Sequence, residues 1–391
     1  MPTYDFKTTI PRTDCGSFKW EEMLPYHCPE NVIPFSIADM ELRTMPEVTE
    51  GLKEFFDQNI LGYTGPTKDY KKAVTDWMLR HHDWVANSDW IVTTPGVVQA
   101  FFTAVRTFTN PGDSVLLLTP VYYPMYFAIE RNNRKIAASP LINTDGRYTI
   151  DFADFEAKAK LPETKLFLLC SPHNPTGRVW TKKELQELNR ICLENNVFVC
   201  SDEIHNDLIF PGHTHTVFAS LGKEAEQNCM VCTAPSKTFN LAGVQTSNIF
   251  LPNPEVRKQF KEELNCQGNS GCNILGLEAC RLAYTHGDQW LAQLMALLET
   301  NQQTIREFFR EHYPMVTISP LEGTYLLWLD LRKLEPDAKK LAALLREEGH
   351  LFFDDGYIFG DEGAGFERWN LACPTCYIEA ALQRFDSIFK Q

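Results

Sequence analysis

Short apolar segments alternate with amphipathic helical patterns through the middle of the chain, and this alternation restricts the possible folds more than any other feature. The apolar segments are bounded by Pro, Gly or Asp and cover residues 114–118, 165–170, 197–201, 229–234 and 247–251. The helical patterns cover residues 97–108, 123–132 and 182–195. Thr181 stands before the last of them as an N-cap, with Glu184 completing a capping box. Together these patterns predict buried parallel strands in a doubly wound α/β sheet.

The pattern changes near residue 270. Long helical patterns and then strand-like segments follow, at residues 272–283, 288–310, 315–318, 324–331 and 366–372. They indicate a smaller α+β domain. The first forty residues contain several prolines and no sustained period, so we expect an arm that packs against the small domain. The predicted division is an arm over residues 1–45, a large domain over residues 46–275 and a small domain over residues 276–391.

Composition and charge exclude several classes of protein. Apolar residues make up 44% of the chain and charged residues 23%, which argues against disorder and coiled coil. No run of about 18 apolar residues predicts a membrane span, and the N-terminus lacks the apolar core of a signal peptide. We therefore expect a cytoplasmic protein. The net charge of −14 disfavours nucleic acids and anionic membranes as partners.

The cysteines and paired histidines do not form a strong metal motif. Twelve cysteines without a secretion signal are expected to be reduced thiols. Cys229 with Cys232 and Cys373 with Cys376 form two Cys-x-x-Cys pairs, but a zinc site would require the distant pairs to meet in the fold. The paired histidines lack a further ligand at suitable spacing, and we interpret them as loop or surface residues: His81 with His82, and His213 with His215. We expect no metal.

Polar residues follow three of the predicted strands. Lys237 comes after the strand that ends near residue 234, Asn174 after the strand ending at residue 170, and Asp202 after the strand at residues 197–201. A lysine in such a loop is most often simply solvated. However, the carboxyl ends of parallel strands share one edge of a sheet, where open α/β sheets bind their ligands. Arg368 lies in an apolar strand of the small domain, where its charge requires an anionic partner.

These four residue types suit a cofactor with an aldehyde and a pyridine ring. A lysine forms a Schiff base with an aldehyde, which requires a neutral amine and hence a lowered pKa. An aspartate pairs with a protonated ring nitrogen and keeps the ring an electron sink. An arginine binds a carboxylate through its planar fork. We therefore predict a site for such a cofactor together with an amino acid.

The motifs around these residues resemble a known family. SPHNPTG, SDEIHNDL and SKTFNLAG, with gaps of 28, 35 and 131 residues between Asn174, Asp202, Lys237 and Arg368, are similar to the fold-type I pyridoxal-phosphate enzymes of the class I and II aminotransferase superfamily. His205, where typical aminotransferases carry Tyr, and the segment IADMEL resemble the MalY/PatB group of cystathionine β-lyases and cystalysin-like carbon-sulfur lyases. The resemblance implies a type I fold, pyridoxal 5'-phosphate as cofactor and β-elimination.

The resemblance also implies a role for each matching residue. Lys237 corresponds to the lysine that holds the cofactor, Asp202 to the partner of the pyridine nitrogen and Asn174 to the residue that bonds the phenolic oxygen. Tyr122 corresponds to the ring that stacks on the cofactor, with core or loop packing as the alternative. Its neighbour Tyr123 is expected to face the substrate as well. Arg368 is expected to bind the carboxylate of the substrate.

The cofactor's phosphate is expected at the start of the helix at Gly96, Val97 and Val98, because free N–H groups and the helix dipole favour an anion there. Ser236 adds a hydroxyl group. Tyr63 resembles a tyrosine that reaches the phosphate from a neighbouring subunit, which implies a homodimer. The alternative is that Tyr63 packs within a turn.

Two positions depart from the family pattern, and one histidine has an open role. Gln245 stands where many aminotransferases place an arginine on the phosphate, and Thr375 replaces the arginine of the usual Cys-Pro-Arg. Neither change affects the lysine. His205 lies beside Asp202 in the sequence, so we assign it to contact with the cofactor ring or to structure rather than to general-base catalysis.

The expected reaction is β-elimination on a sulfur amino acid, giving a thiol, pyruvate and ammonia. A thiolate is a good leaving group because the pKa of a thiol is only about 8.5. An aminotransferase is the alternative, because the same residues serve both reactions until the carbanion forms. A regulatory protein that binds the cofactor is the second alternative, although no segment resembles a DNA-reading module.

Overall fold

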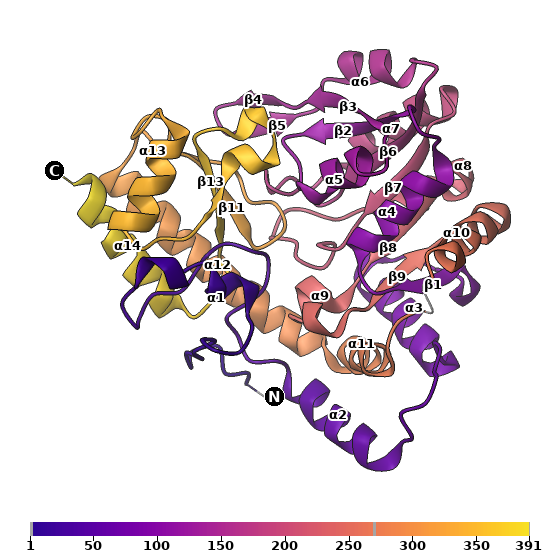
Figure 1. Ribbon diagram of the computed structural model, residues 1–391, viewed down its shortest axis with the longest axis horizontal. Helices are drawn as coiled ribbons and strands as arrows, with labels where there is room; N and C mark the ends of the chain where they lie inside the picture. Colours follow the sequence, from indigo (N-terminus) through magenta and orange to yellow (C-terminus); the bar gives the residue numbers. More distant parts are fainter. Residues whose placement is uncertain (1–2, 269–270, 391) are drawn as a thin grey trace.

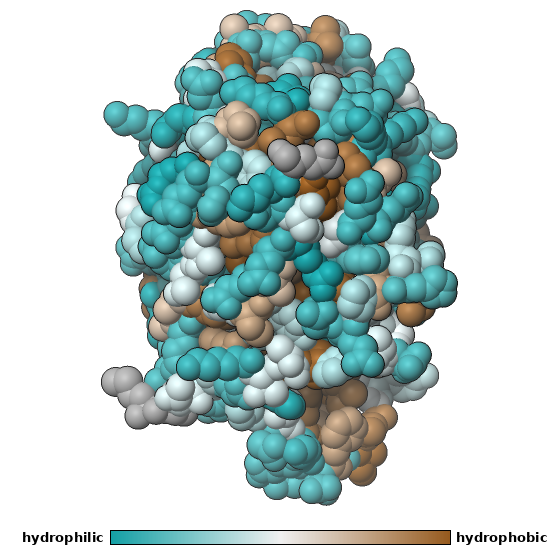
Figure 2. Space-filling view, turned by 90° about the vertical axis from the view of Figure 1, so that its left-hand side faces the viewer, coloured by the Kyte–Doolittle hydropathy of each residue, from teal (hydrophilic) through white to brown (hydrophobic). Residues whose placement is uncertain are grey.

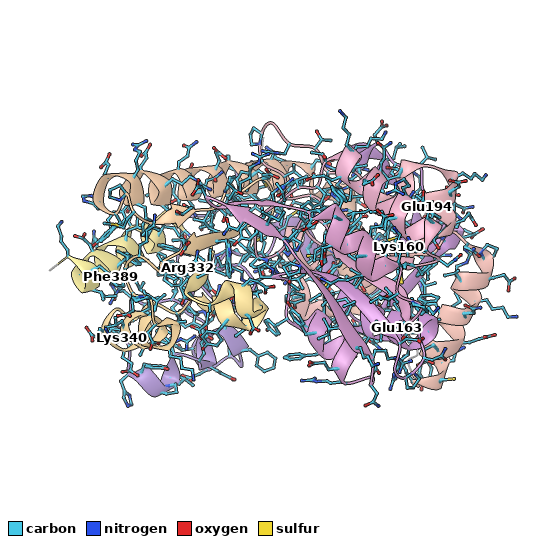
Figure 3. The ribbon with its side chains drawn as sticks, turned by 90° about the horizontal axis from the view of Figure 1, so that it is seen from above. Lys160, Glu163, Glu194, Arg332, Lys340 and Phe389 are labelled. Atoms are coloured by element: carbon cyan, nitrogen blue, oxygen red, sulfur yellow. The ribbon has the colours of Figure 1, made fainter. Side chains whose placement is uncertain are left out.

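Two sheets organise the molecule and lie side by side along its long axis (Figures 1 and 3). The computed structural model describes residues 3–268 and 271–390. Figure 3 places Lys160, Glu163 and Glu194 at the end formed by the larger sheet and its helices. Arg332, Lys340 and Phe389 lie at the opposite end, with the smaller sheet.

The larger sheet is mixed but mostly parallel. Its seven strands follow the order β1-β9-β8-β7-β6-β2-β3, and all neighbours from β8 to β3 run parallel. The doubly wound α/β fold is therefore confirmed. The strands are β1 (Ile91–Thr94), β2 (Ser114–Thr119), β3 (Lys135–Pro140), β6 (Thr164–Cys170), β7 (Phe198–Asp202), β8 (Cys229–Thr233) and β9 (Ser247–Phe250), and a separate hairpin joins β4 (Ile142–Thr144) to β5 (Arg147–Thr149).

The expectation that residues 247–251 form a parallel strand is wrong. β9 runs antiparallel to both of its neighbours, β8 and β1. A parallel connection needs a crossover along the sheet, usually through a helix. Residues 234–246 instead contain only the four-residue helix α9 (Pro235–Thr238) and one 3₁₀ turn, Ala242–Val244. The chain therefore re-enters the sheet at the end where it left.

Helices cover both faces of the larger sheet. Val115 and Leu117 of β2 are buried in one apolar cluster with α4, whereas Leu116 and Leu118 belong to the other, with α7. This alternation reflects the period of two along a strand. The helices of this part are α2 (Pro46–Gln58), α3 (Lys68–His82), α4 (Val97–Phe108), α5 (Pro124–Glu130), α6 (Phe152–Ala159), α7 (Lys182–Glu194), α8 (Lys223–Gln227), α10 (Pro254–Cys266) and α11 (Ile274–His286).

Local sequence signals give several helix ends correctly. α4 covers the residues that its pattern predicts. The Thr181 side chain accepts from the Glu184 backbone N–H, and the Glu184 carboxylate accepts in turn from the backbone N–H of Thr181. The predicted capping box is therefore confirmed.

The smaller sheet is antiparallel and has the strand order β10-β11-β13-β12. The long helix α12 packs beside α14 (Figure 1). The α+β character predicted for this part of the chain is thus observed. Its elements are α12 (Asp288–His312), β10 (Thr317–Ile318), β11 (Leu326–Asp330), α13 (Ala338–Ala343), β12 (Asp354–Asp355), β13 (Phe366–Asn370) and α14 (Thr375–Phe389).

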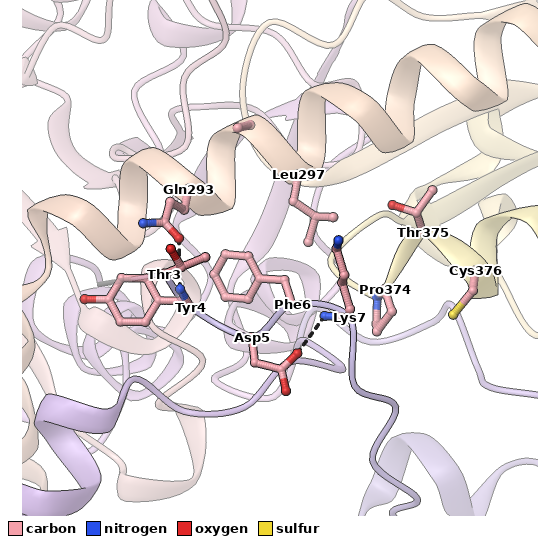
Figure 4. A pocket seen from close by; sticks show the side chains of 11 residues that line it. Thr3, Tyr4, Asp5, Phe6, Lys7, Gln293, Leu297, Pro374, Thr375 and Cys376 are labelled. Atoms are coloured by element: carbon pink, nitrogen blue, oxygen red, sulfur yellow. Dashed lines mark hydrogen bonds between the residues drawn. The ribbon is translucent and has the colours of Figure 1, made fainter. Parts of the chain in front are cut away.

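The N-terminal arm, with the short helix α1 (Phe18–Glu21), contacts elements of the C-terminal part. Tyr4 and Phe6 pack edge-on against Trp290 of α12, at ring-centroid distances of 5.2 and 4.8 Å. Figure 4 shows this first segment lying along α12 beside the start of α14. Farther along, Phe35 packs on Trp369 of β13. The domain boundaries at residues 45 and 275 stay predictions.

Hydrophilic residues cover most of the face of the molecule shown in Figure 2, with hydrophobic residues in hollows between them and in a group at its lower edge. This face belongs to the C-terminal end of the molecule. Within residues 3–268 and 271–390, no helix is both long and apolar enough to cross a bilayer.

Candidate active site

A cavity of about 150 Å³ lies where β6, β7 and β8 end, beside the start of α4. Its walls bring together side chains that are far apart in the sequence. Nine of the predicted site residues line it: Gly96, Val97, Val98, Tyr122, Asn174, Asp202, His205, Ser236 and Lys237. Several residues that were not predicted also line it, among them Ala38 from the arm, Cys170 and Ile204.

Lys237 lies on α9, near the centre of the molecule (Figure 1). Its Nζ donates to the backbone oxygen of Ala38 at 2.6 Å, and the Tyr325 hydroxyl donates to the same oxygen at 2.8 Å. Burial and the charge of Arg368 lower the pKa of Lys237 to about 8, although nearby aspartates oppose this shift. Near neutral pH a much larger share of this amine is therefore neutral than of an ordinary lysine, and the neutral form is the one that attacks an aldehyde.

The arm segment that contacts Lys237 has an unusual backbone conformation. Ile37 has a φ of 39°, which is uncommon for a β-branched residue. The Asn370 side chain donates to the backbone oxygens of Ile37 and Asp39, at 2.8 and 2.6 Å. These bonds fix the Ala38 carbonyl over the lysine.

Asp202 ends β7 and is buried at 4% exposure. Burial raises the pKa of its carboxyl to about 7, although the backbone N–H of Ile204 and the charge of Lys237 partly counteract this. A cationic ring nitrogen beside Asp202 would stabilise the charged carboxylate. The side chain therefore suits the predicted pairing with a pyridine ring.

His205 provides an independent test of the cofactor fit. Its Nδ1 is buried without a hydrogen-bond partner, and the residue lines the cavity. Burial and the charges of Lys237 and Arg368 hold its pKa well below the usual value, so the imidazole is neutral. A ring with polar substituents in the cavity would give this atom a partner, whereas an empty apolar cavity would leave it unsatisfied.

The start of α4 forms the other end of the cavity. Gly96 is the N-cap of this twelve-residue helix and has extended backbone. A Cβ at Gly96 would meet no atom within 4 Å, so the backbone faces open space. Val97 and Val98, which open the helix, line the same cavity as Ser236. This end therefore suits an anionic group such as a phosphate.

Arg368 on β13 lies beside the cavity and is almost completely buried. Its Nη1 donates to the Asn174 side-chain oxygen at 2.9 Å. Its Nε donates to Asp354 Oδ2 at 3.1 Å, and its Nη2 donates to the same oxygen. The anionic partner expected for Arg368 is thus Asp354, which the sequence analysis did not identify.

The sequence that forms this cavity matches a known family over most of its length. The sequence matches the family described as "Aminotransferase class I and II" over residues 30–385. The chain belongs to this family.

Individual members of the family are similar to the chain over nearly its whole length. The chain is 39% identical to "Cystathionine beta-lyase PatB" of Bacillus subtilis (strain 168), over 95% of this chain and 96% of that protein. It is 30% identical to "Protein MalY" of Escherichia coli (strain K12), over 96% of both chains. The structure of cystalysin from Treponema denticola, which contains a pyridoxal 5'-phosphate cofactor, superposes with a TM-score of 0.98 at 44% identity, covering 100% of this chain and 99% of that one.

Three predicted site residues do not line the cavity: Arg368, Tyr123 and Tyr63. Tyr123 lies next to it, with its ring centroid 5.4 Å from that of Tyr122. Tyr63 is fully exposed on the loop after α2, beside exposed Ile60 and Leu61. The alternative that Tyr63 packs within a turn is therefore wrong.

The two positions at which the sequence departs from the usual family pattern, Gln245 and Thr375, lie outside the cavity. Gln245 is exposed in a left-handed conformation with a φ of 51°. Thr375 begins α14, and its hydroxyl donates to the Asn301 side chain at 2.8 Å. Neither residue lines the cavity.

The interpretation of the paired histidines as loop or surface residues is wrong for two of them. His82 is on α3, and its buried Nε2 lies 2.8 Å from Asp207 Oδ1. His215 is buried, with its Nε2 at 2.8 Å from Glu203 Oε2. Both carboxylates follow β7 and need a partner once buried. His213 is exposed, as expected.

The cysteines and histidines of the described part of the chain form no group of three or more side chains that could hold a metal. All twelve cysteines are free. Cys229, Cys232 and Cys373 are buried, whereas Cys376 is exposed.

Proposed function

We propose that this protein is a pyridoxal 5'-phosphate-dependent carbon-sulfur lyase that performs β-elimination on sulfur amino acids and releases a thiol, pyruvate and ammonia. The central observation is the buried lysine of lowered pKa that shares one cavity with Asp202, Asn174 and His205. The similarity to PatB and cystalysin along the whole chain supports this choice within the family. The cytoplasmic location stays a prediction from the sequence.

Each wall of the cavity has a proposed task in holding the cofactor. When bound, pyridoxal phosphate supplies an electron sink for a carbanion at the substrate Cα. Lys237 would attach the cofactor, Asp202 would pair with its ring nitrogen, and Asn174 and His205 would serve its phenolic oxygen. Tyr122 would stack on the ring. The start of α4, where Gly96, Val97, Val98 and Ser236 line the cavity, would hold the phosphate.

The chain's own residues then bind the substrate and move its proton. Arg368 and Asn174 hold the α-carboxylate, and Tyr123, whose ring lies beside that of Tyr122, contacts the rest of the substrate. The Lys237 amine would take the Cα proton, for which its lowered pKa is well suited. Departure of the thiolate from Cβ completes the elimination, and the thiolate takes up a proton to give the thiol. Water then hydrolyses the released enamine to pyruvate and ammonia.

The decisive experiment adds L-cystathionine to the purified protein loaded with the cofactor. Formation of pyruvate and a free thiol without any keto acid would support the lyase. Strict dependence on an added keto acid would instead support an aminotransferase, the reaction for which the family is named. Cofactor binding without turnover of any amino acid would favour a regulatory role.

The lowered pKa of Lys237 predicts how fast the cofactor is incorporated. Only the neutral amine attacks an aldehyde, so the rate should increase about tenfold for each pH unit below the pKa and level off above it. With a pKa of about 8, the plateau begins near pH 8. Stopped-flow absorbance of cofactor-free protein mixed with pyridoxal phosphate measures this rate. A rate that keeps rising toward pH 10 would show an ordinary lysine pKa instead.

We also propose a homodimer in which Tyr63 reaches the phosphate site of the partner subunit. The exposed apolar cluster of Ile60, Leu61 and Tyr63 supports this proposal, because exposed apolar side chains that lie together commonly mark interfaces. We expect Tyr63→Ala to weaken cofactor binding about tenfold, the effect of losing one hydrogen bond to a charged group. Equilibrium titration measures this change. Val85→Ala, an exposed apolar residue elsewhere, is the control and should bind normally.

A further inference from the structure

The arginine proposed to bind the substrate is already paired within the protein. Asp354 on β12 lies directly opposite Arg368 on β13 in the antiparallel register. Arg368 Nε is 3.1 Å from Asp354 Oδ2, and Nη2 donates to the same oxygen. Paired positions on antiparallel strands point to the same face, so the register itself holds the two side chains together.

Other contacts fix the orientation of the Arg368 guanidinium. Nη1 donates to Asn174 Oδ1 at 2.9 Å, and the guanidinium carbon lies 4.7 Å from the ring centroid of Phe359. A guanidinium has five N–H groups, and three of them are used by Asp354 and Asn174. One N–H on Nη1 and one on Nη2 remain to bind a carboxylate. A substrate bound there would share the arginine with Asp354.

Because Asp354 shares Arg368 with the substrate, it reduces the net positive charge of the substrate site. Arg368 and Asp354 are both buried, so their charges are weakly screened and nearly cancel. The charge of Asp354 also acts on two residues that line the cavity, since it opposes the lowering of the pKa of Lys237 and contributes to the raised pKa of Tyr122. Asp39 and Asp202 add further negative charge around Lys237. After one carboxylate has bound, the site therefore has little positive charge left for a second.

The geometry points to Asp354 as a specificity-determining residue that offsets the charge of Arg368, so that the site accepts amino acids with an uncharged or zwitterionic side chain and disfavours those with an anionic one. This inference rests on the proposed function, because it assigns Arg368 to the substrate's α-carboxylate. Thioethers and disulfides joined to a second amino-acid unit belong to the accepted class. Dicarboxylic amino acids belong to the disfavoured class.

The neighbouring residue offers a matched control. Asp355 lies on the same strand, is equally buried and is also paired with an arginine, Arg346, at 2.7 Å. It accepts from the Tyr357 hydroxyl as well, and it is paired in register with Glu367 rather than with Arg368. Asp355→Asn therefore removes a buried charge from the same strand without altering the partner of Arg368.

The test uses L-asparagine and L-aspartate, which have nearly the same shape and differ by one charge. Each is titrated into the cofactor-loaded protein at constant ionic strength, and the change in cofactor absorbance gives its Kd. We expect the native protein to bind asparagine at least tenfold more tightly than aspartate. Asp354→Asn should reduce this preference to threefold or less, mainly because it binds aspartate more tightly. Asp354→Glu and Asp355→Asn should keep the native preference.

Several results would overturn the inference. An unchanged ratio in Asp354→Asn, or an equal change in Asp355→Asn, would show that the charge of Asp354 does not select the substrate. Equal weakening of both ligands in Asp354→Asn would show that the carboxylate only holds Arg368 in place. If Asp354→Asn does not fold, the native protein alone can overturn the inference. It does so if the native protein binds asparagine less than threefold more tightly than aspartate. A native protein whose cofactor absorbance responds to no amino acid would overturn the proposed function itself.

Discussion

Lys237→Ala should form pyruvate from L-cystathionine at least about a thousandfold more slowly than the native protein. Two contributions are lost together, since the alanine can neither attach the cofactor nor take the Cα proton. Proton transfer by a positioned base alone typically increases the rate of a reaction about 10²–10⁴-fold. Coupling pyruvate formation to NADH oxidation measures the rate, and the absorbance of the bound cofactor reports the lost attachment.

Lys182→Ala is the control for this change. Lys182 is exposed at the start of α7, so its loss should leave the rate within about twofold, as surface substitutions usually leave stability nearly unchanged. If Lys237→Ala keeps more than a tenth of the native rate, the lysine is not the catalytic base and the proposed function fails at its centre.

Asp202→Asn should lower kcat by about 10²–10³-fold, the loss typical of removing one preorganised electrostatic contact. The amide keeps the shape of the side chain but cannot stabilise a protonated ring nitrogen, so the cofactor becomes a weaker electron sink. The cofactor should still bind, because the lysine and the phosphate site remain. Steady-state kinetics and cofactor absorbance, measured on the same preparation, separate these two effects.

Glu203→Gln is the matched control for Asp202→Asn. Glu203 is the next residue and is also buried, but it does not line the cavity and is bonded to Ser201, His215 and the backbone of Phe218. Removing the negative charge of Glu203 should lower the melting temperature, because these bonds are weakened. kcat should change by less than about threefold. Equal losses of kcat in the two variants would mean that Asp202 acts through local structure rather than through its charge.

The parts of the fold that depend on local pattern were predictable from the sequence. The capping box at Thr181 and the extent of α4 follow from short-range signals, and both appear as expected. The direction of β9 was not predictable in this way. An apolar segment looks the same whichever way it runs, and its direction depends on the path of the preceding loop, residues 234–246.

The site shows the same division between local and long-range information. Lys237, Asp202 and Asn174 lie at or just after the ends of apolar strands. The motifs around them therefore identify them as site residues from the sequence. Ala38 contributes only a backbone oxygen, so its side chain carries no signal of its role. Asp354 became identifiable only through its register opposite Arg368. His82 and His215 were assigned to the surface because their buried carboxylate partners lie more than ten residues away along the chain.

The bonds around Lys237 join distant parts of the chain. The bond from Lys237 to Ala38 spans 199 residues, that from Arg368 to Asn174 spans 194, and that from Tyr325 to Ala38 spans 287. Long loops must close before such contacts form, which delays them in folding. Recovery of cofactor absorbance after dilution from denaturant should therefore be among the last events of refolding, after the return of helical circular dichroism.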